Sequence, residues 1–292
     1  MDESWKIGVL GASSFVGECA IQRLRKDGRH IVAFSRSPHL GKIESDVTRL
    51  QLSPAVAASC EIPPIKGWLC VAPIRVLPQY FPMIEGSGVR RVVALSSTSL
   101  LVKKDSSDQG EQHIARRLAE GEQALRTWAA PRGVEWVILR PTLIYGRGRD
   151  RNVTEIVRFV RRWGFFPLLG PAEGLRQPVH AEDVAAACVS ALTVPAAANQ
   201  TYNLSGGETL PYREMVCRVF ATVGKVPHLV TVPRWIFQVA VSAVRLVPRY
   251  LHWTVEMAER MNRDLVFDHA DAARDLSFSP RPFVLSPEDL PV

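Results

Sequence analysis

The stretch that decides the fold is Lys6-Ile-Gly-Val-Leu-Gly11-Ala-Ser-Ser14-Phe-Val-Gly17-Glu-Cys-Ala-Ile-Gln-Arg-Leu24. It predicts a short apolar strand that runs through a glycine-spaced turn into an amphipathic helix. Gly11 accepts a tight turn without a Cβ penalty, and Gly17 allows the helix to pack close to the strand. The N–H groups of the first helical turn attract a diphosphate. Such a unit is typical of a nucleotide-binding α/β domain.

The middle position of this turn is Ser14, where glycine is usual. Its Cβ and hydroxyl project toward a pyrophosphate, so a cofactor either sits slightly further away or accepts a hydrogen bond from Ser14. A glycine-containing turn that binds no dinucleotide is the alternative interpretation. The residues expected to contact the phosphates are Gly11, Ser13, Ser14, Phe15, Val16 and Gly17.

Composition sets the broad class. The 292 residues suffice for a Rossmann domain plus a small appended lobe. Five cysteines without C-x-x-C spacing, and histidines without a metal-ligand pattern, predict reduced thiols and no metal. The N-terminus lacks the basic region and long apolar stretch of a secretory signal, so we expect a cytoplasmic protein.

The formal net charge of +7 bears on the partners. Nucleic acid is not expected, because the arginines are spread over the chain and aromatic residues are not interleaved with them. The charge favours an anionic small-molecule substrate, above all a phosphate. Whether the chain forms a homodimer stays open.

Apolar β-rich runs alternate with helical patterns, which predicts a doubly wound parallel sheet covered on both faces. The expected strands are Lys6–Leu10, His30–Ser35, Gly67–Ala72, Arg91–Ser96, Trp136–Arg140 and Gln200–Leu204. The expected helices are Phe15–Lys26, Arg75–Ser87, Glu111–Ala130, Asn152–Trp163, His180–Leu192 and Tyr212–Val223. Residues 1–225 are predicted to form the NAD(P)-binding domain, with a substrate-lobe insertion near 147–178, a turn-rich connection over 164–178, and a mainly helical lobe over 226–292.

Six blocks in this order carry a family resemblance: Gly11–Gly17, Ser96–Thr98, Leu139–Gly146, Pro178–Ala185, Tyr202–Gly207 and Phe267–Leu276. Together they resemble the short-chain dehydrogenase/reductase superfamily, in its extended and atypical branches, the NAD-dependent epimerase/dehydratase-like proteins. The resemblance implies a Rossmann-type sheet that holds NAD or NADP and a smaller C-terminal lobe that closes over the substrate.

The residue that ends the second strand should lie beside the adenosine ribose, where arginine favours a 2′-phosphate. Arg36 holds this place, which favours NADP over NAD, with a solvated arginine as the alternative. The resemblance implies further cofactor contacts at Asp46 and Val47 (the adenine), Val71, Ala72, Pro73, Ser96, Pro141 and Leu143.

In this family a Ser or Thr, a Tyr and a Lys four residues after the Tyr carry proton transfer. Thr98 matches the Ser/Thr position, whereas the following helix contains no tyrosine, and the tyrosine and lysine are expected to be absent. His113 and Arg117 have the same spacing, which places them on one helix face. An imidazole with a pKa of about 6.5 can exchange a proton at neutral pH. The alternative is that both are solvated surface residues.

The resemblance also implies substrate contacts. Arg176 occupies the place of an arginine that meets a diphosphate, and Ser97 and Tyr145 are the other candidates, with a structural role as the alternative for Tyr145. His180 and Asp183 open a helix and are expected to be structural. Arginines that would add positive potential are Arg147, Arg149, Arg151, Arg158, Arg161 and Arg162.

The most apolar segment is 233–253, which is too short and too interrupted to span a bilayer. Three interpretations stay open for it: a buried lobe helix, a wall for a lipid-like or aromatic substrate, and a membrane-surface helix. The sequence therefore predicts an NAD(P)-dependent oxidoreductase or epimerase acting on a carbonyl or alcohol carbon of a phosphorylated or nucleotide-linked substrate. The alternative is an NADP-binding scaffold or redox sensor without turnover, associated with a membrane or a complex.

Overall fold

The computed structural model of the protein describes residues 6–36, 45–52, 62–233 and 259–291. The chain divides into two compact units. Unit 1 comprises Met1–Thr142, Ala181–Leu204 and Asp268–Ser279, and unit 2 comprises Leu143–His180, Ser205–Phe267 and Pro280–Val292. This division differs from the boundary predicted at residue 225. Residues 205–225 pack within unit 2, whereas 268–279 return to unit 1, where the helix they contain packs on the last strand of the sheet.

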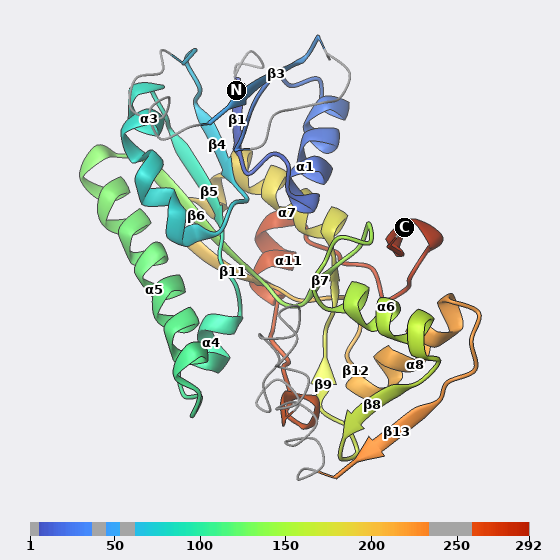
Figure 1. Cartoon of the computed structure of the whole chain (residues 1–292). Helices are drawn as coiled ribbons and strands as arrows, with labels where there is room; N and C mark the ends of the chain where they lie inside the picture. Colours follow the sequence, from blue (N-terminus) through green and yellow to red (C-terminus); the bar gives the residue numbers. More distant parts are fainter. Residues whose placement is uncertain (1–5, 37–44, 53–61, 234–258, 292) are drawn as a thin grey trace. The chain divides into compact units, whose positions relative to one another are not determined.

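Unit 1 is built on a seven-stranded parallel sheet with the strand order β11-β6-β5-β4-β1-β2-β3 (Figure 1). The strands are β1 (Ile7–Leu10), β2 (Ile31–Ser35), β3 (Val47–Gln51), β4 (Gly67–Cys70), β5 (Arg91–Leu95), β6 (Glu135–Pro141) and β11 (Gln200–Leu204). Central strands such as β1, β4 and β5 are buried throughout, as strands covered on both faces must be. The predicted fold class is confirmed.

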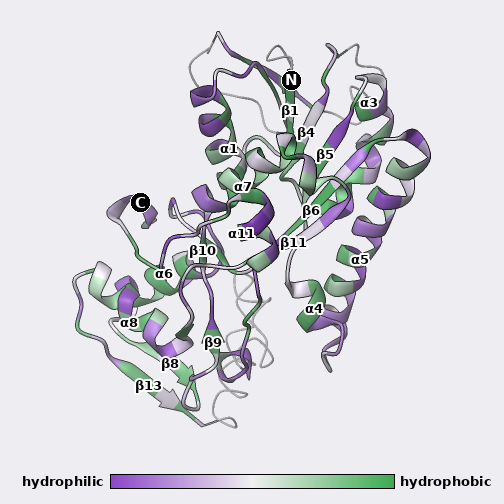
Figure 2. Cartoon of the chain, turned by 180° about the vertical axis from the view of Figure 1, so that it is seen from behind, coloured by the Kyte–Doolittle hydropathy of each residue, from purple (hydrophilic) through white to green (hydrophobic). Residues whose placement is uncertain are grey.

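Helices lie on both faces of this sheet, and in Figure 2 the outer helices α1 and α5 carry both hydrophilic and hydrophobic residues. The main helices are α1 (Phe15–Lys26), α3 (Phe81–Gly86), α4 (Ser99–Lys103), α5 (Gln109–Ala129), α7 (Ala181–Thr193) and α11 (Ala270–Leu276). Short 3-10 segments are η1 (Ile74–Tyr80), η2 (Ala130–Arg132) and η3 (Pro195–Ala197). The helix predicted over 75–87 is divided into η1 and α3, because Pro78 and Pro82 each lack the N–H that a continuous helix needs.

The core of unit 1 is centred on Trp68 of β4, which is fully buried. Its ring stacks on Phe34 of β2 with the ring centroids 5.1 Å apart. Its indole N–H donates to the Ser87 hydroxyl at 3.0 Å, so the buried polar atom has a partner. This packing fixes β2 and β4 on either side of β1.

In the residues that the structure describes, unit 2 holds three two-stranded sheets and two longer helices. β7 (Ile144–Tyr145) pairs in parallel with β10 (Val179–His180), β9 (Leu175–Arg176) pairs antiparallel with β12 (Leu210–Pro211), and β8 (Phe166–Leu169) pairs in parallel with β13 (Leu229–Val232). The helical segments are α6 (Val153–Trp163), α8 (Tyr212–Thr222), η5 (Arg260–Asn262) and η6 (Pro287–Asp289). Tyr145, Leu168 and Phe220 are among the fully buried side chains of its core.

Unit 2 departs from the expected secondary structure in two places. The connection predicted as turn-rich over 164–178 contains β8 and β9, and a strand, β13, opens the region predicted to be mainly helical. The apolar segment 233–253 lies outside the described residues apart from Pro233, so its three interpretations stay predictions. Within the part of the chain that the structure describes, we find no helix with the length and apolar character needed to cross a membrane.

Candidate functional site

The turn after β1 is fixed against two neighbouring strand ends. Gly11 has a φ of +88°, and a Cβ on it would lie 2.6 Å from the Ala72 nitrogen. The N–H groups of Gly11 and Ala12 both donate to the Phe34 carbonyl at 3.1 Å. The turn therefore sits at the carboxyl ends of β1, β2 and β4, the edge where open α/β sheets bind ligands.

Ser14 begins the helix as its N-cap, and its hydroxyl oxygen accepts a hydrogen bond from the Gly17 N–H at 3.0 Å. A Cβ on Gly17 would lie 2.5 Å from the Gly11 carbonyl oxygen, so the helix start can pack there only without a side chain. The Ser14 oxygen faces its own helix, and its proton stays available to donate.

The fit of this turn to a diphosphate can be judged from its donors. The N–H groups of Phe15 and Val16 open α1 and have no acceptor inside the helix, as at every helix start. Ser13 is exposed beside them. Donors at the positive end of a twelve-residue helix suit an anionic group, and the residues present fit the pyrophosphate of a dinucleotide.

Three residues predicted to lie along the cofactor are brought beside this turn. The N–H groups of Val71 and Ala72 donate to the Leu10 carbonyl at 3.0 and 3.2 Å, and the exposed Pro73 follows them. Arg36 lies at the same edge of the sheet, exposed just past the end of β2. Its carbonyl accepts a hydrogen bond from the Gln51 side chain at 3.1 Å, which places Gln51 at this edge as well.

Asp46 and Val47 lie elsewhere, and the adenine contact expected of them is corrected. Val47 starts β3 opposite Ile31, whereas Gln51 ends β3 opposite Ser35. In parallel strands this places Val47 about 13 Å from the carboxyl edge, at roughly 3.3 Å per residue. The Asp46 carboxylate accepts from Arg25 at 2.7 Å, which lowers the pKa of Asp46. The pair therefore anchors the end of α1 at the opposite edge of the sheet.

Glu122 of α5 is a buried centre that the sequence interpretation missed. Its side chain is 2% exposed, and its two oxygens accept from the Arg140 guanidinium at 2.8 and 2.5 Å. The Ser96 hydroxyl donates to the same carboxylate at 2.6 Å, and Arg126 donates at 3.2 Å. Burial opposes ionisation, but the bonds from Arg140 and Ser96 outweigh it and lower the pKa of Glu122. An acidic residue on the apolar face of a predicted helix is the signal that could have indicated it.

Ser96 and Thr98 are therefore both engaged with the protein. Thr98 is 5% exposed, and its hydroxyl donates to the Pro141 carbonyl at 3.2 Å. The half-buried Ser97 lies between them, and its oxygen accepts from the Ser99 N–H at 3.1 Å, which leaves its proton available. The catalytic role expected of Thr98 and the substrate contact expected of Ser97 stay predictions.

His113 and Arg117 are exposed on α5. Glu122, which contacts Ser96, follows Leu118 by four residues and Ile114 by eight, so these three share one side of the helix. His113 and Arg117 precede Ile114 and Leu118 by one residue, or about 100° of rotation. The predicted pair thus does not share the side of α5 that contacts Ser96.

Pro141 and Leu143 fall on different units. Pro141 ends β6 at the carboxyl edge of the sheet, and its carbonyl accepts from the backbone N–H of Thr98 at 3.1 Å. Leu143 opens unit 2 and packs against the core of that unit. The nicotinamide-side contact expected of both residues stays a prediction.

Tyr145 is a core residue, which corrects its assignment to the substrate. Its side chain is fully buried, and its ring meets those of His180 and Phe283 edge-on at 5.1 and 4.9 Å. Its hydroxyl donates to the Val284 carbonyl at 3.3 Å. A phenol with these partners ties the C-terminal segment to β7.

Arg176 is likewise held by the protein itself, and the predicted diphosphate contact is corrected. The residue is 5% exposed, and its guanidinium donates to the carbonyls of Leu175 and Arg263 at 2.7 and 2.8 Å and to that of Arg260. The guanidinium also lies over the Tyr212 ring, 5.4 Å from its centre. Burial lowers the pKa of Arg176. The side chain fixes the 260–263 segment to β9.

His180 and Asp183 have structural surroundings, as expected. Asp183 lies in the first turn of α7. The His180 ring contacts the Asp289 carboxylate at 3.0 Å, and both side chains are buried. Burial opposes ionisation of Asp289, but hydrogen bonds from His180, Ser286 and the Arg147 N–H hold its pKa well below the ordinary value.

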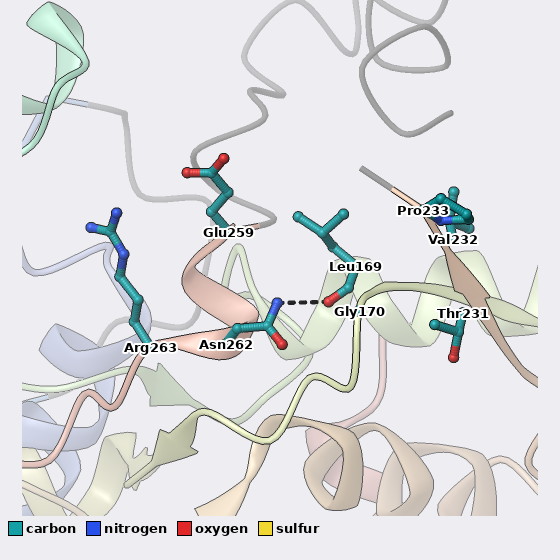
Figure 3. Close-up of a pocket in the computed structure, with 8 residues that line it drawn as sticks. All are labelled: Leu169, Gly170, Thr231, Val232, Pro233, Glu259, Asn262 and Arg263. Carbon is teal, nitrogen blue, oxygen red and sulfur yellow. Dashed lines mark hydrogen bonds between the residues drawn. The ribbon is translucent and has the colours of Figure 1, made fainter. Parts of the chain in front are cut away.

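A cavity of about 650 Å³ opens on unit 2 between the ends of β8 and β13 and the η5 segment (Figure 3). The Asn262 amide is part of the lining and donates to the Leu169 carbonyl at 2.6 Å, while the amide oxygen accepts from the Ala172 N–H at 2.8 Å. None of the predicted site residues lines this cavity. Among the residues that the structure describes, no group of three His, Cys, Asp or Glu side chains is placed to hold a metal ion.

Residues 82–205 match the model of the NAD dependent epimerase/dehydratase family. The UDP-glucose 4-epimerase of Vibrio cholerae is 27% identical over 161 residues, which cover 52% of this chain and 49% of that protein. Subunit 9 of the NADH dehydrogenase [ubiquinone] 1 alpha subcomplex of Arabidopsis thaliana is 30% identical over 150 residues, 51% of this chain and 35% of that protein. The matches span half or less of these curated relatives.

Solved structures resemble the chain over nearly its full length. The UDP-glucose 4-epimerase of Thermotoga maritima with UDP-glucose has a TM-score of 0.72 at 14% identity, covering 97% of this chain and 95% of that one. MoeE5 in complex with UDP-glucose and NAD has a TM-score of 0.69 at 19% identity, covering 95% and 94%. At such identities the likeness shows the fold, and it agrees with the family resemblance found in the sequence blocks.

Proposed function

We propose that this chain belongs to the NAD-dependent epimerase/dehydratase family, whose model matches residues 82–205, and that it binds a pyridine dinucleotide and acts on a carbonyl or alcohol carbon of a nucleotide-linked sugar. The observation that carries the proposal is the turn at Gly11–Gly17, whose helix-start donors lie at the carboxyl edge of the sheet. The substrate class is inferred from relatives named as UDP-glucose 4-epimerases.

The chain's own residues would hold the dinucleotide at its phosphates and along the strand ends. The N–H groups of Phe15 and Val16 would donate to the phosphates, and the Ser14 hydroxyl keeps a proton to add a third donor. Val71 and Ala72 would line the path beside the turn. A bound nicotinamide supplies or accepts the hydride, whereas the protein supplies orientation and proton donors.

Between the two dinucleotides, we propose a preference for NADP. Arg36 is exposed at the ribose end of β2, and its guanidinium can meet a 2′-phosphate with two N–H groups. Arg36→Ser is expected to weaken NADP binding and leave NAD binding unchanged. Equal affinities of the parent protein for NADP and NAD would contradict the proposed preference for NADP.

For the substrate oxygen, we propose the Ser97 hydroxyl as the donor. The Thr98 proton is engaged with Pro141, and the Ser96 proton with Glu122. His113 is exposed about 100° around α5 from the Ser96-facing side, a side on which we propose that Ile114 and Leu118 replace the family's tyrosine and lysine. The reaction would then depend on how the protein positions the substrate against the dinucleotide, more than on a side chain that acts as a general acid.

Turnover of UDP-glucose with NAD or NADP, followed by product analysis, tests this function. Activity that is lost in Ser97→Ala and kept in Ser190→Ala, a serine on α7, is the expected result. His113→Phe is expected to keep activity as well. Binding of the dinucleotide with no turnover of any UDP-sugar would contradict the enzymatic function.

A second function is favoured by one observation, the apolar residues Leu118, which packs on the core of unit 1, and Ile114, which is 45% exposed one turn before it on α5. With no titratable side chain at these two positions, the fold can hold a dinucleotide without proton transfer. A cofactor-binding subunit without turnover is therefore the second candidate, and the resemblance to an NADH dehydrogenase subunit agrees with it. Saturable binding without turnover in the same assay would identify it.

A further inference from the structure

The end of α6 and a nearby loop of unit 2 form an exposed surface that the proposed function does not use. We call it the α6 tip and define it by the half-buried Lys225 and the exposed residues Arg161, Arg162, Trp163, Val226 and His228. Contacts of Lys225 and His228 hold the loop against the end of α6 and the residues that follow it. The Lys225 ammonium donates to the carbonyls of Val160 and Arg161 at 3.1 and 2.9 Å, and the Phe165 and His228 rings are 6.3 Å apart.

Apolar side chains are unusually exposed at the α6 tip. Trp163 is 55% exposed and Val226 is 87% exposed, although the opposite side of α6 is buried through Val157 and Val160. The helix therefore has one apolar face in the core and a second apolar group, Trp163, facing solvent. A tryptophan beside cations at a helix end is the arrangement found where proteins meet a membrane interface.

The cations of the tip are not neutralised by carboxylates in the described part of the chain. Arg161 donates to the Pro291 carbonyl, Lys225 to two carbonyls, and the Arg162 guanidinium lies over the Trp163 ring at 5.1 Å. By contrast, Arg158 on the same helix is paired with Glu155 at 2.6 Å. Carbonyls and an aromatic ring leave the positive charge in place, so the surface is complementary to a dense array of anions.

We propose that the α6 tip docks the protein on an anionic lipid surface. Phosphate headgroups would accept hydrogen bonds from Arg161, Arg162 and Lys225, while Trp163 and Val226 enter the boundary below the headgroups. A nucleic acid would engage the cations but would leave the Val226 side chain in water. An anionic bilayer offers phosphates to the cations and an apolar boundary to Trp163 and Val226, and the electrostatic part of its attraction weakens as the salt concentration rises.

Sedimentation of the full chain with vesicles tests the proposal. Binding is expected to vesicles of phosphatidylcholine mixed with phosphatidylglycerol, to weaken in high salt, and to be several-fold weaker with phosphatidylcholine alone. Arg162→Gln should reduce binding about fivefold, the effect of roughly one juxtamembrane charge. Trp163→Ser and Val226→Ser should each reduce it as well.

Matched controls separate docking from a general loss of charge or apolar surface. Arg116→Gln on α5 removes an exposed arginine elsewhere, and Val284→Ser removes a valine that is 63% exposed, and both should bind as the parent does. Two results would overturn the proposal. One is no binding to the mixed vesicles, or equal binding by all variants. The other is self-association of the parent in vesicle-free solution that Trp163→Ser abolishes, which would make the tip a contact between copies of the chain.

Discussion

Glu122 provides the sharpest stability prediction, because one buried carboxylate connects α5 with β6 and the end of β5. Glu122→Gln keeps the size and shape of the side chain but removes its charge and turns one oxygen into a donor. Both Glu122 oxygens accept from Arg140, so the amide NH₂ faces the guanidinium in either orientation and one of the two Arg140 hydrogen bonds is lost.

The magnitude follows from the burial of the partners. Breaking a buried ion pair by removing one charge costs about 3–5 kcal/mol. Arg140 is 18% exposed and Arg126 is 31% exposed, so water partly compensates both cations. We therefore expect a loss of about 2–3 kcal/mol in the free energy of unfolding, or roughly 5–10 °C in Tm for a chain of this size.

Urea unfolding followed by circular dichroism measures this change. Glu120→Gln is the matched control, because Glu120 is exposed on the same helix and should shift the free energy of unfolding by less than about 0.5 kcal/mol. A double-mutant cycle with Ser96→Ala should give a coupling energy above about 0.5 kcal/mol. A Glu122→Gln protein as stable as the Glu120→Gln protein would refute the reasoning.

Three further predictions concern the turn and unit 2. Gly11→Ala should lower the free energy of unfolding in urea by more than about 2 kcal/mol, because the new Cβ would lie 2.6 Å from the Ala72 nitrogen. Gly28→Ala, also at positive φ but with nothing within 4 Å, should lower it by about 1 kcal/mol, and equal losses would contradict the close approach at Gly11. Asp289→Asn should lower Tm at neutral pH. Because the pKa of Asp289 is lowered in the folded protein, its stabilising effect is full above the ordinary value of 3.8 and is lost as pH falls through the folded pKa. The Tm difference between the variant and the parent should therefore shrink below about pH 4. A Tm difference independent of pH would show that the charge of Asp289 is not its source. Arg176→Met should lower the free energy of unfolding, measured by thermal unfolding, by about 2–3 kcal/mol because buried carbonyls lose their donor. An unchanged stability would contradict the structural role of Arg176.

α1 was predicted correctly from the sequence, whereas β3 was not. The helix predicted over Phe15–Lys26 has these bounds in the structure, because a capping serine, apolar spacing and a glycine turn all specify the same local geometry. β3 was missed, since an edge strand with one buried residue in five shows no apolar run. As a result, Asp46 and Val47 were placed at the wrong edge of the sheet.

The partners of isolated polar residues were harder to predict. Arg176 bonds to carbonyls 84 and 87 residues away, and Tyr145 to one 139 residues away, contacts that no local pattern encodes. Glu122 left a local signal, a carboxylate between Leu118 and Leu125 on the buried side of α5. Its meaning depended on Arg140, which only the pairing of β5 with β6 brings near Ser96.

Calorimetric titration of the purified chain with NADP and NAD tests the central claim, that the helix-start donors after β1 hold the phosphates of a dinucleotide. Saturable binding of one nicotinamide dinucleotide per chain, weakened when Ser14→Asp places a carboxylate among those donors and unchanged in Glu120→Gln, is the predicted result. Absence of saturable binding to either dinucleotide, or unchanged binding in Ser14→Asp, would contradict it.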